Sequence, residues 1–356
     1  MDAGSIPAVS TKLYIKDYMK TFYDIEEQDR AISILQKAYL NDSIAQAYLF
    51  DGISGIGKSL VAKVFIKLIN CKNPTPTLNP CNKCSNCIKI EKNSFIDLIH
   101  IKPNSTKEII KIDKIRQIEE KIAYKAYNGK YKVILIEDAE QMNISSSNAL
   151  LKTLEEPPPN TVFILTASKI SKLPDTILSR CQKILFSPLS KEVIYAKLKL
   201  EYNSLEDNNL KIIASISQGS MTIAKEIIEN NILNLRKEFI EIILLQNNTK
   251  LANLIKYIKK IIKEFKGENF YFLAFFLEIL KSIIRDALIF NSKLSKNLLL
   301  NFDYINVIEK ISTNDSNILI QEGEKISNLQ NQILTNVNIE TAFENYFISF
   351  LKRGIV

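Results

Sequence analysis

The chain has 356 residues and a mass of 40.6 kDa, and at about 150 residues per domain this length predicts two or three domains. Hydrophobic residues make up 46% and charged residues 24% of the sequence, which is typical of globular proteins and argues against disorder, collagen-like repeats and coiled-coil rods. The single histidine, His100, excludes metal sites built from several histidines. A Ser-His-Asp active site would depend on His100 alone.

The net charge is basic, because 47 Lys and Arg residues outnumber 39 Asp and Glu residues by 8. This balance suits a nucleic-acid or phosphate partner, but it equally suits an ordinary solvated surface. No apolar stretch approaches the roughly 20 residues that cross a bilayer, and the first ten residues resemble no secretory signal. We therefore expect a cytoplasmic protein without a membrane segment, in which clustered cysteines bind metal rather than form disulfides.

The first half of the chain alternates short β-rich runs with helical patterns, whereas residues after about Leu189 show helical apolar spacing almost throughout. The β-rich runs are continuously apolar, which is typical of a parallel sheet covered on both faces. They are Ala47–Phe50, Asp97–Ile101, Lys132–Ile136, Thr161–Thr166 and Lys183–Phe186. The helical patterns between them are Glu27–Tyr39, Lys58–Asn70, Lys111–Tyr124 and Ser145–Glu155.

Pro157–Pro159 ends a helix within the first half, and Pro188 closes the part that contains the strands. Residues 191–229 predict a few short helices interrupted by Gly219, and residues 234–356 predict longer amphipathic helices. The positions with this spacing are Phe239, Ile242, Ile243, Leu251, Leu254, Ile255, Ile258, Phe343, Phe347, Phe350 and Leu351. The predicted fold class is an α/β domain followed by all-α domains.

The strongest motif is GISGIGKS at residues 52–59, which fits the phosphate-binding pattern of glycine, four residues, glycine, lysine and serine. It follows a predicted strand and opens a predicted helix, so that backbone N–H groups and the helix N-terminus can surround phosphates. We expect Lys58 to reach the β- and γ-phosphates and Ser59 to bind Mg²⁺. The alternative is a glycine turn without a ligand. The predicted binding residues are Gly52, Gly55, Gly57, Lys58 and Ser59.

An acidic pair, Glu137 and Asp138, follows the apolar run that ends at Ile136. Phosphate-loop ATPases place one carboxylate here for Mg²⁺ and often a second that orients the attacking water. Acids are common at strand ends, so the pair indicates a nucleotide site only because it follows the phosphate loop. A displacement of about 1 Å can cost about a hundredfold in rate, so the order of the two acids matters.

Four cysteines lie within seventeen residues, and the two-residue spacings between three of them bring sulfurs within reach of one metal ion. A tetrahedral zinc site with a structural role is the favoured interpretation, because four sulfurs leave no open position for catalysis. An iron–sulfur cluster is the alternative. The predicted ligands are Cys71, Cys81, Cys84 and Cys87. We expect the fifth cysteine, Cys181, to be a small buried hydrophobe, and His100 to be a packed core residue.

Together with the sequences NALLKTLEEPP at residues 148–158 and LPDTILSRC at residues 173–181, these motifs resemble bacterial clamp-loader ATPases, the gamma/tau and delta-prime subunits of DNA polymerase III. The resemblance is close from about Phe22 to Ser190 and looser beyond. It implies an AAA+ fold in three parts. These are a phosphate-loop domain at residues 1–188 with an inserted zinc module at about 71–87, a helical lid at 189–235, and at 236–356 a helical collar that joins five subunits in a ring.

The resemblance also implies catalytic roles for Glu137, Asp138 and Arg180. In that family the arginine of the Ser-Arg-Cys sequence acts as a finger on the nucleotide of the neighbouring subunit, which gives Arg180 a role in trans. Such charge neutralisation is worth about 10³ to 10⁵ in rate. From spacing alone, Arg180 is equally an ordinary surface charge.

Three departures from the motor subunits of that family favour a delta-prime subunit. The acidic pair has the order Glu-Asp, Thr222 stands where the motors have a lid arginine, and residues 12–22 contain no arginine. We therefore expect a subunit that binds ATP with Mg²⁺, hydrolyses it slowly or not at all, and presents Arg180 in trans. The alternatives are a gamma/tau-type motor ATPase and a nucleotide-independent scaffold, against which intact Lys58 and Ser59 count.

The partners implied by the resemblance are the gamma/tau and delta subunits in a hetero-pentamer, the sliding clamp, and primer-template DNA. Since no base-reading motif is visible, we expect DNA contacts to be made to phosphates and to be insensitive to sequence. The expected cofactors are ATP, Mg²⁺ and Zn²⁺.

Overall fold

The computed structural model describes residues 21–103, 108–122, 126–241, 256–257, 259–260, 270–333 and 339–353. The chain forms two compact units. The first contains residues up to Val193 and the segment Gly219–Thr222, and the second contains Ile194–Gln218 and the residues from Ile223 onward. In the part of the chain that is described, no helix is long and apolar enough to cross a membrane. The division into three domains after residues 188 and 235 stays a prediction.

The first unit is an α/β structure. Its elements are η2 (Phe22–Asp24), α1 (Asp29–Leu40), β1 (Ala47–Asp51), α2 (Lys58–Ile69), α3 (Ser85–Glu91), β2 (Leu98–Ile101), α4 (Ile112–Ile122), β3 (Lys132–Ile136), η3 (Ala139–Gln141), α5 (Ile144–Glu155), β4 (Thr161–Ala167), η4 (Ile170–Lys172), α6 (Asp175–Leu178) and β5 (Gln182–Leu185). All five predicted strands and all four predicted helices form. The end predicted for α4, at Tyr124, lies outside the described residues.

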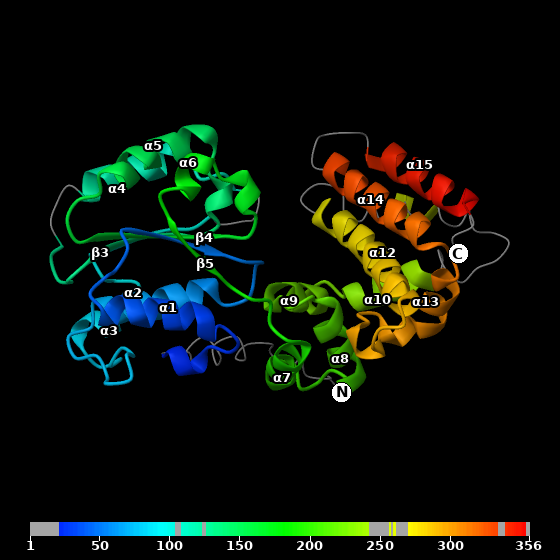
Figure 1. Cartoon of the computed structure of the whole chain (residues 1–356), viewed down its shortest axis with the longest axis horizontal. Coiled ribbons are helices and arrows are strands. Elements are labelled where there is room, and N and C mark those ends of the chain that lie inside the picture. The colour runs from blue at the N-terminus through cyan, green and yellow to red at the C-terminus, as the bar shows by residue number, and fades with distance from the viewer. Residues whose placement is uncertain are drawn as a thin grey trace, which may run out of the picture. The chain divides into compact units, whose positions relative to one another are not determined.

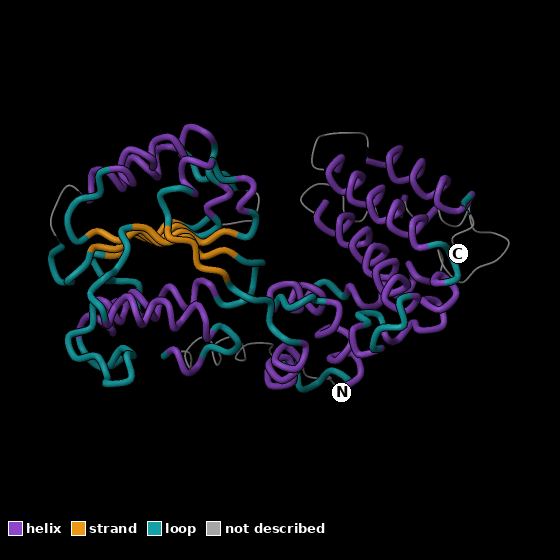
Figure 2. Tube along the Cα trace, viewed as in Figure 1, coloured by secondary structure: helices purple, strands orange, loops and turns teal. Residues whose placement is uncertain are grey.

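The five strands form one parallel sheet in the order β2-β3-β4-β1-β5. Every residue of β3 and β4 is buried, which explains why these runs are apolar throughout rather than alternating. Because the strands are parallel, their carboxyl ends meet at one edge of the sheet. The tube view shows the sheet enclosed between two helical layers (Figure 2).

Helices α1, α2 and α3 cover one face of the sheet and α4, α5 and α6 cover the other (Figure 1). The second face is packed by a cluster of buried residues from β3, β4, α4 and α5 that includes Ile134, Ile136, Phe163, Leu165, Ile115, Ile118, Leu150 and Leu154. On α4, Ile115, Ile118 and Ile122 recur at helical spacing and point into this cluster. The remaining positions of α4 are largely polar, so the helix is amphipathic.

The second unit is helical. From the end of the first unit onward the elements are α7 (Lys191–Glu201), α8 (Asp207–Ile216), α9 (Met221–Glu229), α10 (Ile232–Ile240), α12 (Phe270–Asn291), η6 (Lys296–Leu298), η7 (Phe302–Tyr304), α13 (Ile305–Ser312), α14 (Ser316–Ile333) and α15 (Ile339–Lys352). Their core includes the aromatic cluster Phe239, Phe276, Phe343, Phe347 and Phe350. The predicted apolar positions Ile242, Ile243, Leu251, Leu254, Ile255 and Ile258 lie outside the described residues.

Candidate functional site

The phosphate loop connects β1 to α2 at the carboxyl edge of the sheet. Gly55 and Gly57 have positive φ angles of 77° and 100°, which residues with a side chain rarely adopt. A Cβ atom on Gly55 would also lie 2.5 Å from the backbone nitrogen of Thr222. These two positions therefore require glycine for the loop to keep its shape.

The Lys58 side chain is buried beneath this loop. Its Nζ donates hydrogen bonds to the carbonyl oxygens of Ile53 (2.7 Å) and Gly52, and to Ser168 Oγ (3.3 Å). Burial lowers the pKa of Lys58, and the nearby Glu140 carboxylate opposes this shift. The ammonium group thus lies between the phosphate loop and the carboxyl end of β4, where it can meet a phosphate.

Ser59 and Glu137 are in direct contact across the same edge. Ser59 Oγ donates a 2.8 Å hydrogen bond to Glu137 Oε2, and the Lys102 ammonium lies 3.5 Å from the same oxygen. Burial raises the pKa of Glu137, but hydrogen bonds from His100 and Ser59 and the Lys102 charge outweigh it and hold the pKa at about 2. Glu137 is therefore ionised at neutral pH, and the hydroxyl–carboxylate pair fits the oxygen ligands that Mg²⁺ prefers.

The prediction of His100 as a packed core residue is wrong. Its side chain is 35% exposed, and Nε2 lies 2.8 Å from Glu137 Oε1. His100 is in β2, the edge strand next to β3, so the sheet covers it on one side only. It contacts a predicted site residue instead of the core.

Asp138 begins the turn after β3 with a positive φ of 51°, and its N–H donates to Thr166 Oγ1 at 3.2 Å. Burial raises the pKa of Asp138, and so does repulsion from Glu140 and Glu137. The structure thus brings two further residues to the site that the sequence analysis missed, Glu140 and Ser168. Glu140 accepts a 2.9 Å hydrogen bond from the Ser168 N–H. The signal for Ser168 was its position directly after β4, whereas Glu140 lies in the short helix η3 that follows β3.

The segment Gly219–Thr222 lies directly over the phosphate loop. Ser220 Oγ donates a 2.7 Å hydrogen bond to the Ser54 carbonyl, and the Met221 N–H donates to the Gly55 carbonyl at 3.2 Å. Thr222, which stands where the resemblance implies an arginine, is therefore beside the loop. Its side chain is too short to make the contacts of an arginine with a phosphate.

Arg180 is placed apart from these residues, between α6 and β5. Nη1 donates to the Thr176 carbonyl at 3.0 Å, and Nη2 donates to Glu155 Oε1 at 2.7 Å. Neither partner belongs to the phosphate loop or the acidic pair. The next residue, Cys181, is partly buried and packs against the core, and burial raises its pKa to about 11.

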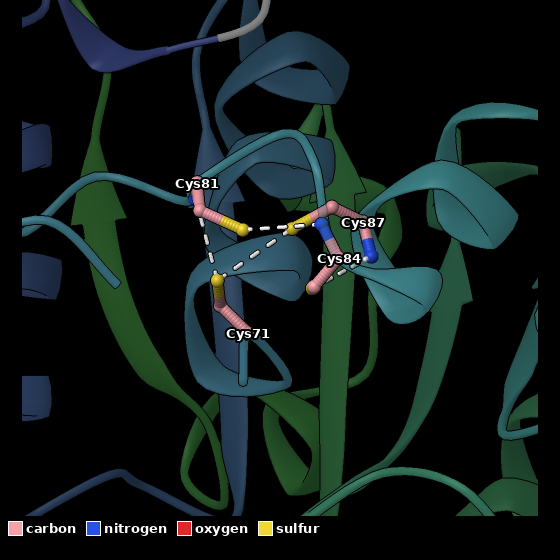
Figure 3. Close-up of side chains that lie close together, drawn as sticks. All are labelled: Cys71, Cys81, Cys84 and Cys87. Atoms are coloured by element: carbon pink, nitrogen blue, oxygen red, sulfur yellow. Dashed lines mark hydrogen bonds between the residues drawn. The ribbon is translucent and has the colours of Figure 1, made fainter. Parts of the chain in front are cut away.

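The four cysteines predicted to bind metal converge on one point (Figure 3), and their sulfur atoms all lie within 4.8 Å of one another. Cys71 follows α2, and Cys84 is the N-cap of α3, a helix that the sequence analysis did not predict. With Zn–S bonds of about 2.3 Å, tetrahedral sulfurs lie about 3.8 Å apart. The donor set and spacing therefore fit a zinc ion.

Backbone amides point at these sulfurs. The N–H groups of Cys81, Cys84 and Cys87 donate to the sulfurs of Cys71, Cys81 and Cys84, respectively, at 3.3 to 3.5 Å. Burial raises the pKa of Cys84, but hydrogen bonds from the backbone of Lys72 and Cys87 outweigh it and lower the pKa to about 6. A thiolate, the form that binds metal, is thereby favoured at this position.

Ion pairs connect the cysteine module to α2, and one of them involves a buried lysine. Lys67 is 1% exposed and forms an ion pair with Glu91 of α3, to which Lys63 also donates at 2.8 Å. Lys67 Nζ further lies 3.3 Å from Asn82 Oδ1, inside the cysteine loop. Since α2 begins at the phosphate loop, one helix connects the two candidate sites.

Comparison with protein families gives two matches along this chain. The model described as "DNA polymerase III, delta subunit" matches residues 27–190, and its C-terminal counterpart matches residues 230–351. The tau subunit of DNA polymerase III from Bacillus subtilis is 36% identical over 215 residues, which are 59% of this chain and 38% of that protein. The chain belongs to the family of DNA polymerase III clamp-loader subunits.

Other members of the clamp-loader family show the same range of similarity. The gamma subunit from Buchnera aphidicola subsp. Schizaphis graminum is 34% identical over 239 residues, 66% of this chain and 64% of that protein. The tau subunit from Escherichia coli is 35% identical over 206 residues, 57% of this chain and 31% of that protein. This clamp-loader subunit thus spans about one third to two thirds of the length of these three relatives.

A solved structure of a gamma subunit-related protein from Thermotoga maritima aligns with 89% of this clamp-loader subunit and 97% of its own chain, at 17% identity and a TM-score of 0.45. The family named from the sequence motifs is confirmed. The comparisons name both delta and tau/gamma subunits of DNA polymerase III.

Proposed function

We propose that this chain is an ATP-binding clamp-loader subunit of the gamma/tau type, which acts in a ring that loads a sliding clamp onto primed DNA. The observation that carries the proposal is the contact between Ser59 and Glu137 beside the buried Lys58 ammonium. Relatives named tau and gamma, 34% to 36% identical over more than half of this chain, support the same assignment.

Each residue at the carboxyl edge has a role in this proposal. The loop N–H groups and Lys58 bind the β- and γ-phosphates, and Ser59 and Glu137 hold Mg²⁺. Mg²⁺, when bound, neutralises phosphate charge. Asp138, whose pKa burial raises, would orient the attacking water, and Ser168 lies beside Lys58 at the end of β4.

Arg180 acts outside its own subunit in this proposal. Its hydrogen-bond partners within the chain are Thr176 and Glu155 rather than phosphate-loop residues, which suits a guanidinium that serves the nucleotide of a neighbour.

The binding partners of the whole chain would be the other gamma/tau and delta subunits of a hetero-pentamer, the sliding clamp and DNA phosphates. The proposed location is the cytoplasm.

The delta-prime subunit is the second candidate, because Thr222 replaces the lid arginine that the motor subunits of the family have. The Glu-Asp order of residues 137 and 138 and the family descriptions that name a delta subunit favour it as well. In this role the chain would bind ATP, hydrolyse it slowly or not at all, and present Arg180 to a neighbouring motor.

The Cys71–Cys87 module would hold one Zn²⁺ with a structural role in either candidate. Its four sulfurs lie close enough for a tetrahedral site, which leaves no position for a reactive water. The ion pairs of Lys63 and Lys67 with Glu91 would connect the folded module to α2.

Equilibrium titration of the isolated chain with a fluorescent ATP analogue and Mg²⁺ tests nucleotide binding. We expect Lys58→Ala to weaken binding about 10- to 100-fold, because hydrogen bonds to a charged group are lost. The matched control, Lys37→Ala on the exposed face of α1, should bind like the wild type. Wild-type protein that does not bind the analogue, or binding that Lys58→Ala leaves unchanged, contradicts the proposal.

A further inference from the structure

The Arg180 guanidinium is held by two separate elements of the first unit. Nη2 donates a 2.7 Å hydrogen bond to Oε1 of Glu155, the last residue of α5. Nη1 donates to the Thr176 carbonyl of α6 at 3.0 Å and to Ser179 Oγ at 3.4 Å. These contacts favour one orientation of the guanidinium, although the Arg180 side chain is 35% exposed.

Stability does not explain why an acid stands at Glu155. A carboxylate in the last turn of a helix interacts unfavourably with the helix dipole. The Glu155 side chain is 51% exposed, and ion pairs between exposed side chains contribute little to the free energy of unfolding. What the contact does supply is orientation, because a free arginine side chain populates many rotamers.

We infer that Glu155 is a positioning residue, which holds the Arg180 guanidinium ready for the phosphates of a nucleoside triphosphate bound by the neighbouring subunit. This inference rests on the proposed role of Arg180 in trans. Preorganisation helps because a guanidinium that is already oriented loses less conformational freedom when it meets the transition state. The contact needs an acceptor atom at Oε1, whereas the negative charge of Glu155 is not required.

Two variants of Glu155 separate its role as a hydrogen-bond acceptor from its negative charge. Glu155→Gln keeps a carbonyl oxygen that accepts from Nη2, and Glu155→Ala removes it. The matched control is Glu156→Ala, which removes the adjacent exposed carboxylate. Arg180→Ala and the double variant Glu155→Ala/Arg180→Ala complete a double-mutant cycle that isolates effects acting through Arg180.

The measurement is the ATPase rate of the reconstituted loader with clamp and primed DNA, resolved into kcat and KM. We expect Glu155→Ala to lower kcat about two- to fivefold without changing KM, since the exposed hydrogen bond that orients Nη2 is lost. Glu155→Gln should stay within about a factor of two of the wild type. On the Arg180→Ala background, Glu155→Ala should cause no further loss, and melting temperatures should not change.

The outcomes separate this inference from the proposed function. If Arg180→Ala lowers kcat but Glu155→Ala does not, the inference is overturned and the trans role of Arg180 stands. An increase of kcat in both Glu155 variants, or an equal loss from Glu155→Ala with and without Arg180, also overturns it. If Arg180→Ala leaves kcat unchanged, the trans role fails and the inference fails with it.

Discussion

The hydroxyl of Ser59 donates a 2.8 Å hydrogen bond to Glu137 Oε2, although the two residues are 78 positions apart in the chain. Ser59 lies in the first turn of α2, and Glu137 follows β3 directly. The parallel sheet brings these two chain positions to one edge. A hydroxyl and an ionised carboxylate then face the same point beside Lys58, as a Mg²⁺-nucleotide site requires.

Replacement of Glu137 by Gln should largely remove the effect of Mg²⁺ on nucleotide binding. The variant removes the carboxylate that Ser59 contacts, and loss of a residue that holds a metal typically weakens metal affinity by about 10- to 100-fold or more. Titration of a fluorescent ATP analogue in Mg²⁺ and in EDTA measures this. Glu156→Gln, an exposed acid outside the site, is the control. A Mg²⁺ effect that survives in Glu137→Gln would count against this assignment.

The purified protein should contain one zinc ion per chain, because the four sulfurs of the module lie within 4.8 Å of one another. Cys84→Ser should reduce the zinc content and the melting temperature. Cys181→Ser, which removes the cysteine outside the module, should keep the zinc. Elemental analysis of the three proteins measures this, and an iron-dependent absorption band would contradict a zinc site.

Glu91→Gln should destabilise the first unit by about 2–3 kcal/mol, because it leaves the buried Lys67 ammonium without its charged partner. Burial raises the pKa of Glu91, but its hydrogen bonds to Lys63 and Lys67 outweigh this and lower the pKa. A lowered pKa means that the stabilisation is present above the unfolded value, about 4.3, and is lost as the pH falls below it.

Urea unfolding of the wild type and Glu91→Gln at pH 7 and at acidic pH measures this difference. The gap in free energy of unfolding should be full at pH 7 and should shrink as the pH falls below about 4.3. Glu192→Gln on the exposed face of α7 should change nothing. A gap that is independent of pH would show that the Glu91 charge does not stabilise the fold.

Gly55→Ala should destabilise the protein by about 1–3 kcal/mol, since a Cβ there would meet the Thr222 backbone at 2.5 Å and φ is 77°. The control is Gly323→Ala in α14, where a Cβ has no atom within 4 Å and alanine should stabilise the helix by up to about 1 kcal/mol. Thermal unfolding measures both. Equal effects of the two substitutions would mean that neither the positive φ nor the Thr222 backbone restricts position 55.

Local patterns in the sequence predict much of this fold. Continuous apolar runs identify β3 and β4 because these strands are buried throughout. Glycines with positive φ at positions 55 and 57 are visible as a phosphate-loop pattern. These features depend on neighbours in the chain, which a sequence displays directly.

Contacts between strands could not be predicted in the same way. The role of His100 depends on β2 pairing with β3, which places it 2.8 Å from Glu137. Likewise, Glu140 meets Ser168 only because β3 lies beside β4. Strand order is set by packing of the whole unit, so a local apolar pattern at His100 predicts a core residue where the structure has an exposed edge.

In the proposed role, this clamp-loader subunit uses its own phosphate loop as a gamma/tau-type motor. The most direct test is the ATPase rate of a reconstituted loader with clamp and primed DNA, with Lys58→Ala or Arg180→Ala introduced in this subunit only. We expect both variants to lower the rate severely, Lys58→Ala by removing turnover at this site and Arg180→Ala by depriving a neighbour of its finger. A rate that Lys58→Ala barely changes while Arg180→Ala cripples it contradicts the motor role and supports the delta-prime role instead.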